Sequence, residues 1–138
     1  MDETAPLTLG DWPVCLAVII CDQVIEDRRS GNKTLVGLFN SINSRQFPCV
    51  HPRCFVLASL TGFKGQIPVS IRVRSPKQEI ARINGELASD NTGVVADIVV
   101  ALEGLPLECE GAYSVDVYVR EELLASRRFN ATIVLPPQ

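Results

Sequence analysis

The chain has 138 residues, of which 46% are hydrophobic and 21% are charged, and its formal net charge is -3. A chain of this length forms one domain with its own core, and this composition is too apolar for a disordered protein. The acidic balance provides no positive field that would attract a polyanion, so it argues against nucleic acid and anionic membrane surfaces as partners. We expect a single domain over residues 1–138, with flexible tails at residues 1–12 and 136–138.

The N-terminal region argues for a cytoplasmic protein. Acidic residues precede the first apolar run, residues 14–20, whereas a secretory signal begins with positive charge and ends in a small-residue cleavage site. The run is also much shorter than the roughly 20 residues that a membrane-spanning helix needs. Five cysteines without regular spacing fit a reducing compartment.

Residues 13–25 are predicted to form the first strand, and this strand is apolar at both parities. One parity holds Val14, Leu16, Val18 and Ile20, and the other holds Cys15, Ala17, Ile19 and Cys21. A strand with two apolar faces is buried on both, either beneath loops or against another subunit. The polar turn at residues 26–33 predicts a hairpin with a second strand over residues 34–42, in which Gly37 indicates a bulge or a close backbone approach.

Residues 43–53 contain two prolines and show no periodicity, so they are predicted to connect the hairpin to the rest of the domain. Further strands follow at turn-bounded apolar segments, with a proline-bearing crossover at residues 105–110. The expected strands span residues 54–60, 67–74, 80–87 and 94–102.

Residues 111–120 show the clearest period-two pattern in the chain. Tyr113, Val115, Val117 and Val119 are predicted to be buried, and Asp116 and Arg120 to be exposed. A tight turn leads into the last strand, residues 123–135. Together these elements predict an all-β fold, an immunoglobulin-like antiparallel β-sandwich of eight or nine strands.

The segment EGAYSVDVYV, which follows the proline-bearing crossover, resembles the penultimate strand of immunoglobulin-like and fibronectin-like sandwiches. In those domains a tyrosine near the start of this strand bonds back to nearby backbone, and Tyr113 is the matching candidate. The antibody hallmarks are missing, because no cysteine lies two residues after Tyr113 and the single tryptophan, Trp12, precedes the first strand. The resemblance therefore concerns architecture.

Four segments also resemble a family of small uncharacterised bacterial proteins, known only as a domain of unknown function. They are CDQVIEDRRSGNKTLVGLFNSI, FPCVHP, LTGFKG and LEGLPLECEGAYSVDVYV. The resemblance covers most of residues 15–135. It implies a bacterial β-sandwich of about this length and carries no activity with it.

Cys49, His51 and Cys54 form the strongest metal-ligand candidate in the sequence. A structural zinc site needs four ligands, usually as paired short spacings from two segments, and this segment offers three. Buried or half-buried thiols beside a rigid turn are the simpler interpretation, so we predict no metal and no cofactor. His51 lacks a local signature for nucleophilic catalysis, and we predict no enzymatic activity.

Two sets of residues are candidates for interaction. Arg72, Arg74 and Arg82 can share one outer sheet face, and Val18 and Ile20 lie on the doubly apolar first strand. That strand predicts either a homodimer or a cover formed by residues 43–53, with Phe47 and Val50 in contact with it. We therefore expect a non-catalytic binding or assembly module that contacts a protein partner. The alternative is a small enzyme or ligand-binding protein with a pocket near residues 43–53.

Overall fold

The computed structural model describes residues 12–135, so the tails expected at residues 1–12 and 136–138 lie outside this range except for Trp12. The described residues form nine strands and no helix, so none of their segments is a helix that could cross a membrane. Trp12, which was expected in the tail, packs against the core. The strands are β1 (Val14–Glu26), β2 (Lys33–Leu38), β3 (Ser41–Ser44), β4 (Cys49–Thr61), β5 (Gly65–Arg74), β6 (Glu79–Ser89), β7 (Ala96–Leu107), β8 (Gly111–Val119) and β9 (Glu122–Ile133).

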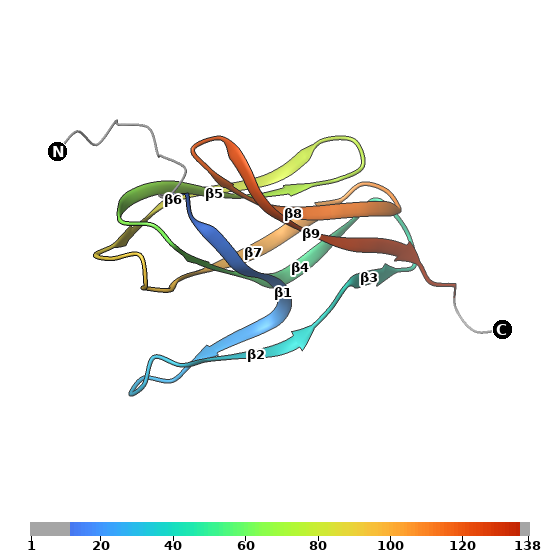
Figure 1. Cartoon of the computed structure of the whole chain (residues 1–138). Coiled ribbons are helices and arrows are strands. Elements are labelled where there is room, and N and C mark those ends of the chain that lie inside the picture. Colours follow the sequence, from blue (N-terminus) through green and yellow to red (C-terminus); the bar gives the residue numbers. More distant parts are fainter. Residues whose placement is uncertain (1–11, 136–138) are drawn as a thin grey trace.

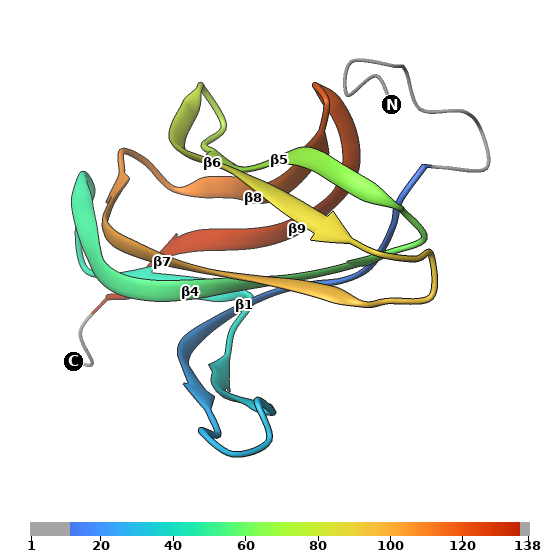
Figure 2. The same cartoon turned by 90° about the vertical axis from the view of Figure 1, so that its left-hand side faces the viewer.

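The strands build two sheets that pack face to face (Figures 1 and 2). The four-stranded sheet has the order β2-β1-β4-β7, and the five-stranded sheet has the order β3-β9-β8-β5-β6. All pairings are antiparallel except that between β3 and β9. Strands β4 and β7 correspond to B and E of an immunoglobulin-like sandwich, and β5, β8 and β9 correspond to C, F and G. The predicted all-β, immunoglobulin-like sandwich is confirmed.

The core lies between the two sheets and depends on strict alternation along β8. Tyr113 is 1% exposed, and Val115, Val117 and Val119 are fully buried. Phe129 of β9 stacks on Tyr113, with ring centroids 5.3 Å apart. The burial predicted for this strand is therefore confirmed.

The prediction that Asp116 is exposed was wrong, since the residue is only 5% exposed. It lies in the middle of the five-stranded sheet, where β5 and β9 flank β8 on both sides. The Ser126 hydroxyl of β9 donates a hydrogen bond of 2.6 Å to its carboxylate, which satisfies the buried charge. Arg120, also predicted to be exposed, is half-buried at the turn that follows β8.

The predicted connections at residues 43–53 and 105–110 were both too long. Strand β4 already begins at Cys49 and pairs with β7 through Leu107, so only residues 45–48 separate β3 from β4. The prolines are compatible with these strands because they lie at sheet edges. Pro106 is on the edge strand β7, and β1 joins β4 only from Phe55 onward, beyond Pro52.

The first hairpin leaves the sandwich as a projecting arm, residues 21–38 (Figure 2). From Cys21 onward β1 pairs with β2, whereas its first half pairs with β4. Gly37 has a φ of +72°, and a β-carbon there would collide with the Asp22 side chain on the paired strand. The close approach expected at Gly37 is confirmed, and it fixes the shape of the arm near its base.

Candidate functional site

Tyr113 links the start of β8 to the loop before it. Its hydroxyl donates a 2.7 Å hydrogen bond to the Cys109 carbonyl and accepts one from the Cys109 backbone N–H. Burial raises the pKa of Tyr113 above its ordinary value of 10.0. The tyrosine is thus a buried structural residue whose hydroxyl is fully used by the backbone.

The three zinc candidates lie along β4 without converging. Cys54 is fully buried in the core, and burial raises its thiol pKa to about 11. His51 instead lies against Phe39, with ring centroids 5.9 Å apart. Within residues 12–135 no three His, Cys, Asp or Glu side chains form a group that could hold a metal ion.

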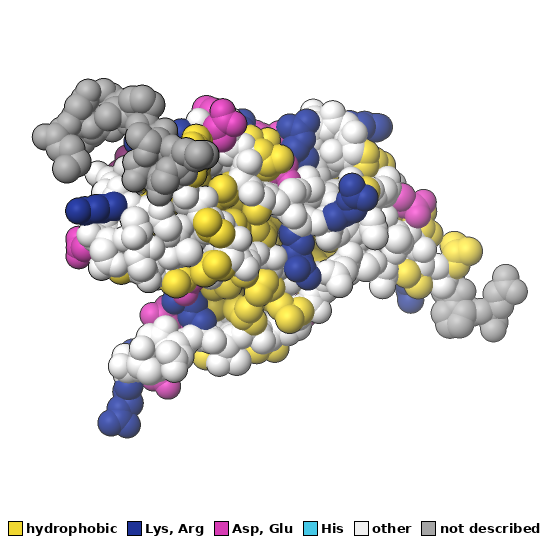
Figure 3. Space-filling model, in the orientation of Figure 1, with side chains coloured by type: hydrophobic (Ala, Val, Ile, Leu, Met, Phe, Trp, Pro, Cys, Tyr) yellow, Lys and Arg dark blue, Asp and Glu magenta, His cyan; other side chains and the backbone are white. Residues whose placement is uncertain are grey.

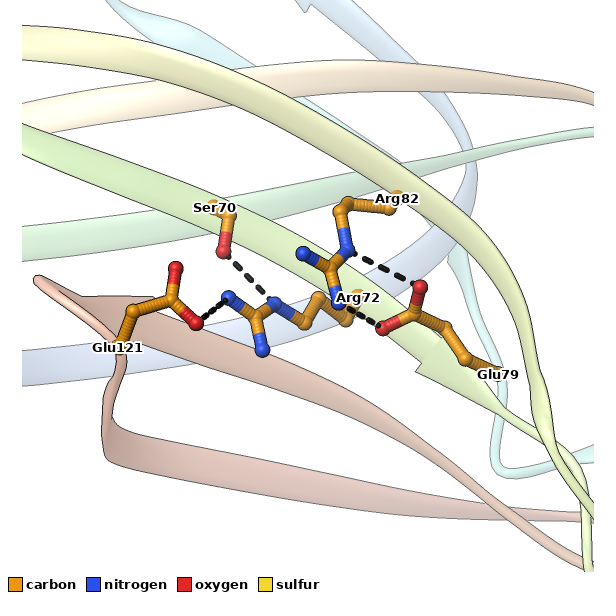
Figure 4. A network of polar contacts seen from close by, with 5 residues as sticks. All are labelled: Ser70, Arg72, Glu79, Arg82 and Glu121. Atoms are coloured by element: carbon orange, nitrogen blue, oxygen red, sulfur yellow. Dashed lines mark hydrogen bonds and ion pairs between the residues drawn. The ribbon is translucent and has the colours of Figure 1, made fainter.

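Arg72 is the centre of the polar outer face of the five-stranded sheet (Figure 4). Its side chain is only 9% exposed, and its guanidinium carbon lies 3.8 Å from the centroid of the Tyr118 ring. Nε donates to the Ser70 hydroxyl at 2.9 Å, and Nη2 donates to Glu121 Oε2 at the same distance. Stacking and hydrogen bonds thus hold the charged group in one orientation.

Arg82 of β6 is the direct neighbour of Arg72 in the sheet and forms its own pair. It donates two hydrogen bonds to Glu79, of 2.8 and 3.0 Å. This contact lowers the pKa of Glu79 below its ordinary value. Arg74, at the end of β5, is exposed and contributes to the same field. The structure therefore brings the three predicted arginines to one face, where carboxylates balance their charge.

The outer face of the four-stranded sheet has the opposite character, because apolar side chains continue across it from strand to strand. One row joins Ile19 of β1, Leu57 of β4 and Val99 of β7, and Phe55 follows in the next row. This row is not part of the core between the sheets. Leu57 is nevertheless only 8% exposed, whereas Val99 is 37% exposed. We call these four residues the apolar face.

The arm forms a crevice of about 500 Å³ with the apolar face. Leu35 and Lys33 of β2 line it together with Leu57 and Asp97. Lys33 Nζ lies 3.6 Å from Asp97 Oδ2, although β1 and β4 separate their strands in the sheet. The arm therefore bends over one end of the apolar face and is tied there by a partly exposed ion pair.

Strand β1 also has an edge without a strand partner within the described residues. Strand β2 pairs with it only from Cys21, and Figure 3 shows hydrophobic side chains gathered where β1 runs beside the arm. Leu16 on β1 and Leu38 at the end of β2 are 55% and 59% exposed. Arg127 of β9 crosses to this edge and donates to the Val18 carbonyl at 3.3 Å.

The interaction candidates on β1 need correction, because Ile20 is fully buried in the core and Val18 packs against that core. The opposite parity, which contains Ile19, forms the outer apolar face. The suggested cover is also absent from this side: Phe47 packs against the core, and Val50 is 61% exposed. Because the two parities of β1 are equally hydrophobic, the sequence could not show which of them faces outward.

Three hollows on the described surface bear on the expected pocket near residues 43–53. One is the arm crevice, and another is lined by Ser41 together with residues of β8 and β9. The third lies beside Pro68 and Arg120. None of these three is lined by a histidine or a cysteine, and none includes a residue of the segment 43–53.

Two facing sheets, the parallel β3–β9 pairing and the Tyr113 hydrogen bond together define an immunoglobulin-like β-sandwich. The chain belongs to a family of unknown function, DUF6941, whose family profile matches residues 16–132. The family resemblance found in the sequence is thereby confirmed. No curated protein matches the chain.

The solved structures similar to this chain include two Pseudomonas proteins. One is the Pseudomonas fluorescens alkylpurine DNA glycosylase AlkC bound to DNA containing an abasic site analogue, at 13% identity and a TM-score of 0.52. The match covers 90% of this chain but 31% of the glycosylase. The other is an immunoglobulin-like protein from Pseudomonas aeruginosa, at 15% identity and a TM-score of 0.45, with 90% of this chain and 99% of that chain covered. At these identities the likeness shows the fold alone.

Proposed function

We propose that this protein is a non-catalytic binding and assembly module, and that a second copy of the chain docks on its apolar face. The observation that carries the proposal is the row Ile19, Leu57 and Val99, which continues across three strands on the side away from the core. Leu57 at the centre of the row is 8% exposed beside the arm crevice, and Val99 is 37% exposed. Apolar side chains that reach the surface of a folded domain in a row are typical of protein contact sites.

The arm supplies area that the apolar face alone lacks. Three strands spaced at about 4.8 Å, over about ten residues of 3.3 Å each, cover roughly 480 Å², and the apolar face is only part of this area. A stable interface needs about 800 Å² from each partner. The arm carries exposed apolar side chains of its own that can add to this area: Ile25 is 48% exposed, Val36 is 42% exposed and Leu38 is 59% exposed. The proposed interface therefore includes the arm.

Charge favours a second copy as the occupant. The pair Lys33–Asp97 lies at one end of the apolar face, and the pair Arg53–Glu103, at 3.5 Å, lies at the other. The border of the apolar face thus has two positive and two negative side chains. When it contacts the same border of a second copy, the charges sum to zero. A two-fold contact requires this self-complementarity, because the same patch faces itself.

A reducing compartment such as the cytoplasm suits the thiols. All five cysteines are free, and burial raises the pKa of Cys15, Cys21 and Cys54. Thiols that remain protonated react slowly with oxidants. The absence of enzymatic activity is part of the same proposal, since the charged groups of the Arg72 face are paired with one another and His51 lies against Phe39.

Light scattering on the purified chain at micromolar concentration tests the proposal. We expect a species of twice the 15.1 kDa chain mass for the natural sequence, and the chain mass for Val99→Asp. The matched control is Val134→Asp, which places the same charge at a residue of similar exposure, 45%, after the last strand. It should remain dimeric.

Circular dichroism of both variants shows whether each keeps its fold. A 15.1 kDa species for the natural chain at all concentrations would overturn the proposed dimer. Equal dissociation of folded Val99→Asp and Val134→Asp would also overturn it, because the effect would then come from added charge alone.

A further inference from the structure

Arg72 has donor capacity that its hydrogen-bond partners among residues 12–135 do not use. Its Nε and Nη2 bond to Ser70 and Glu121, and Figure 4 shows the remaining terminal nitrogen directed away from both. A guanidinium can bind a carboxylate through two parallel N–H donors, the strongest form of this pair. Glu121 accepts from Arg72 through one oxygen only. The Arg72–Glu121 pair thus leaves the two-donor geometry available to another carboxylate.

Glu121 is much more exposed than the arginine that it contacts. Its side chain is 80% exposed, whereas that of Arg72 is 9% exposed. It belongs to the turn between β8 and β9, where Arg120 and Glu121 both have positive φ values, 49° and 66°. A carboxylate that is already mostly in water gives up one hydrogen bond to Arg72 when it leaves, and water replaces that bond, so another carboxylate can displace it at low cost.

The aromatic neighbour keeps Arg72 in place during such an exchange. Tyr118 stacks on the guanidinium, and Ser70 holds Nε, so neither contact depends on Glu121. Arginine and tyrosine are also the residue types most enriched at the energetic centres of protein interfaces. The site is therefore organised before a partner arrives.

We propose that Arg72 is the anchor for a carboxylate of a partner protein, and that Glu121 is the internal carboxylate that this group displaces. The partner is an acidic protein segment. Glu121 remains on the chain after its displacement, so a partner carboxylate adds one negative charge to this face. A phosphate-bearing ligand would add more negative charge beside Glu79, Glu121 and Asp116, which favours a carboxylate. The inference rests on the proposed binding function but uses the five-stranded sheet, so it does not depend on the dimer.

The test is a titration of the protein with the blocked peptide acetyl-Gly-Glu-Glu-Gly-amide, followed by the NMR resonance of the Arg72 Nε–H group. We expect a saturable shift that weakens with added salt and is absent with acetyl-Gly-Gln-Gln-Gly-amide. Glu121→Gln should tighten peptide binding at least threefold, because it removes the competing carboxylate. Arg72→Gln should abolish binding, and Arg72→Lys, which keeps the charge but loses the planar fork, should weaken it. Both variants lack the Arg72 Nε–H group, so binding to them is followed by their backbone amide resonances.

Glu122→Gln is the matched control, since it removes the same charge from the adjacent, exposed residue. It should leave peptide affinity within twofold of that of the natural chain. Equal tightening by both glutamate variants, or weaker binding by Glu121→Gln, would overturn the displacement model. Inorganic phosphate that shifts the Arg72 resonance as strongly as the glutamate peptide would overturn the carboxylate assignment. Loss of dimerisation in Val99→Asp should not affect this titration, so the two proposals fail separately.

Discussion

The two outer faces of this sandwich present different kinds of side chain to the solvent. On the five-stranded sheet, polar and charged side chains are joined to one another: Arg72 to Glu121, Arg82 to Glu79 and Asp116 to Ser126. On the four-stranded sheet, Ile19, Leu57 and Val99 form an apolar row that only the bent arm approaches. The first face is stable in water by itself, whereas the second gains stability from further burial.

This contrast separates two kinds of binding. An apolar face favours extensive contact that excludes water, which suits assembly with a second copy. A polar face that is already hydrogen-bonded binds by exchange of one partner group for another, so it contributes more to specificity than to area. The predictions below change one face, or the core between the faces, and leave the other intact.

The largest effect is expected from neighbouring residues on opposite sides of β1. Ile20→Ala removes a fully buried side chain from the core and should lower the free energy of unfolding by about 2–5 kcal/mol. Ile19→Ala, on the partly exposed apolar face, should cost the isolated chain much less. Urea unfolding of both variants measures the difference. Similar losses would show that the two sides of β1 are equally buried and would remove the contrast on which the assembly proposal rests.

The core should also lose stability in alkali. The pKa of Cys54 is raised from 9.0 to about 11 by burial, so the folded chain holds its proton where the unfolded chain releases it. The stabilising contribution is complete below pH 9 and is lost as the pH rises through about 11, by up to about 3 kcal/mol. Urea unfolding between pH 8 and pH 11 measures this slope. Cys54→Ala should flatten it, and an unchanged slope would assign the effect to other groups.

A tyrosine from the core and one from the polar face provide a matched pair. Tyr113→Phe loses the hydrogen bond to the Cys109 carbonyl and should cost about 0.5–1.5 kcal/mol. Tyr118→Phe retains the ring that stacks on Arg72 and should cost less. Thermal unfolding compares the two variants. A greater loss for Tyr118→Phe would mean that its hydroxyl contributes to the polar face.

The smallest effect is expected at Glu79, which is half-buried on the polar face beside the exposed Arg82. The Arg82 hydrogen bonds lower its pKa below 4.5, so its contribution is present above that pH and is lost as the pH falls through the lowered value. In Arg82→Gln the pKa of Glu79 should return towards 4.5. Carboxyl NMR titration measures it. An unchanged pKa would show that the pair does not persist in solution.

Strand β8 could be predicted from the sequence because its valine side chains face the core and its polar side chains face the outer side of the sheet, so the pattern alternates. The boundaries of β4 could not be predicted, because the prolines at positions 48 and 52 suggested a connection. Pro52 is tolerated in β4 because β1 pairs with β4 only from Phe55 onward, and the sequence does not show where that pairing stops. The burial of Asp116 likewise depends on Ser126, a residue of the adjacent strand that only the sheet register identifies.

The candidate site was predictable only in outline. The spacing of Arg72, Arg74 and Arg82 placed them on one face, but their partners Glu121 and Glu79 and the stacked Tyr118 follow from turn geometry and strand pairing. On β1, both parities are apolar, so the sequence could not decide which one faces outward. The choice of Val18 and Ile20 named the inner parity.

Methyl NMR spectra of the chain on dilution test the central claim most directly, because they report both sides of the four-stranded sheet in one sample. Assembly through the apolar face predicts concentration-dependent shifts at the methyl groups of Ile19, Leu38 and Val99, while those of Val115 and Val117, buried between the sheets, remain unchanged. Shifts confined to residues away from the apolar face and the arm, or no change across the full concentration range, would contradict the account.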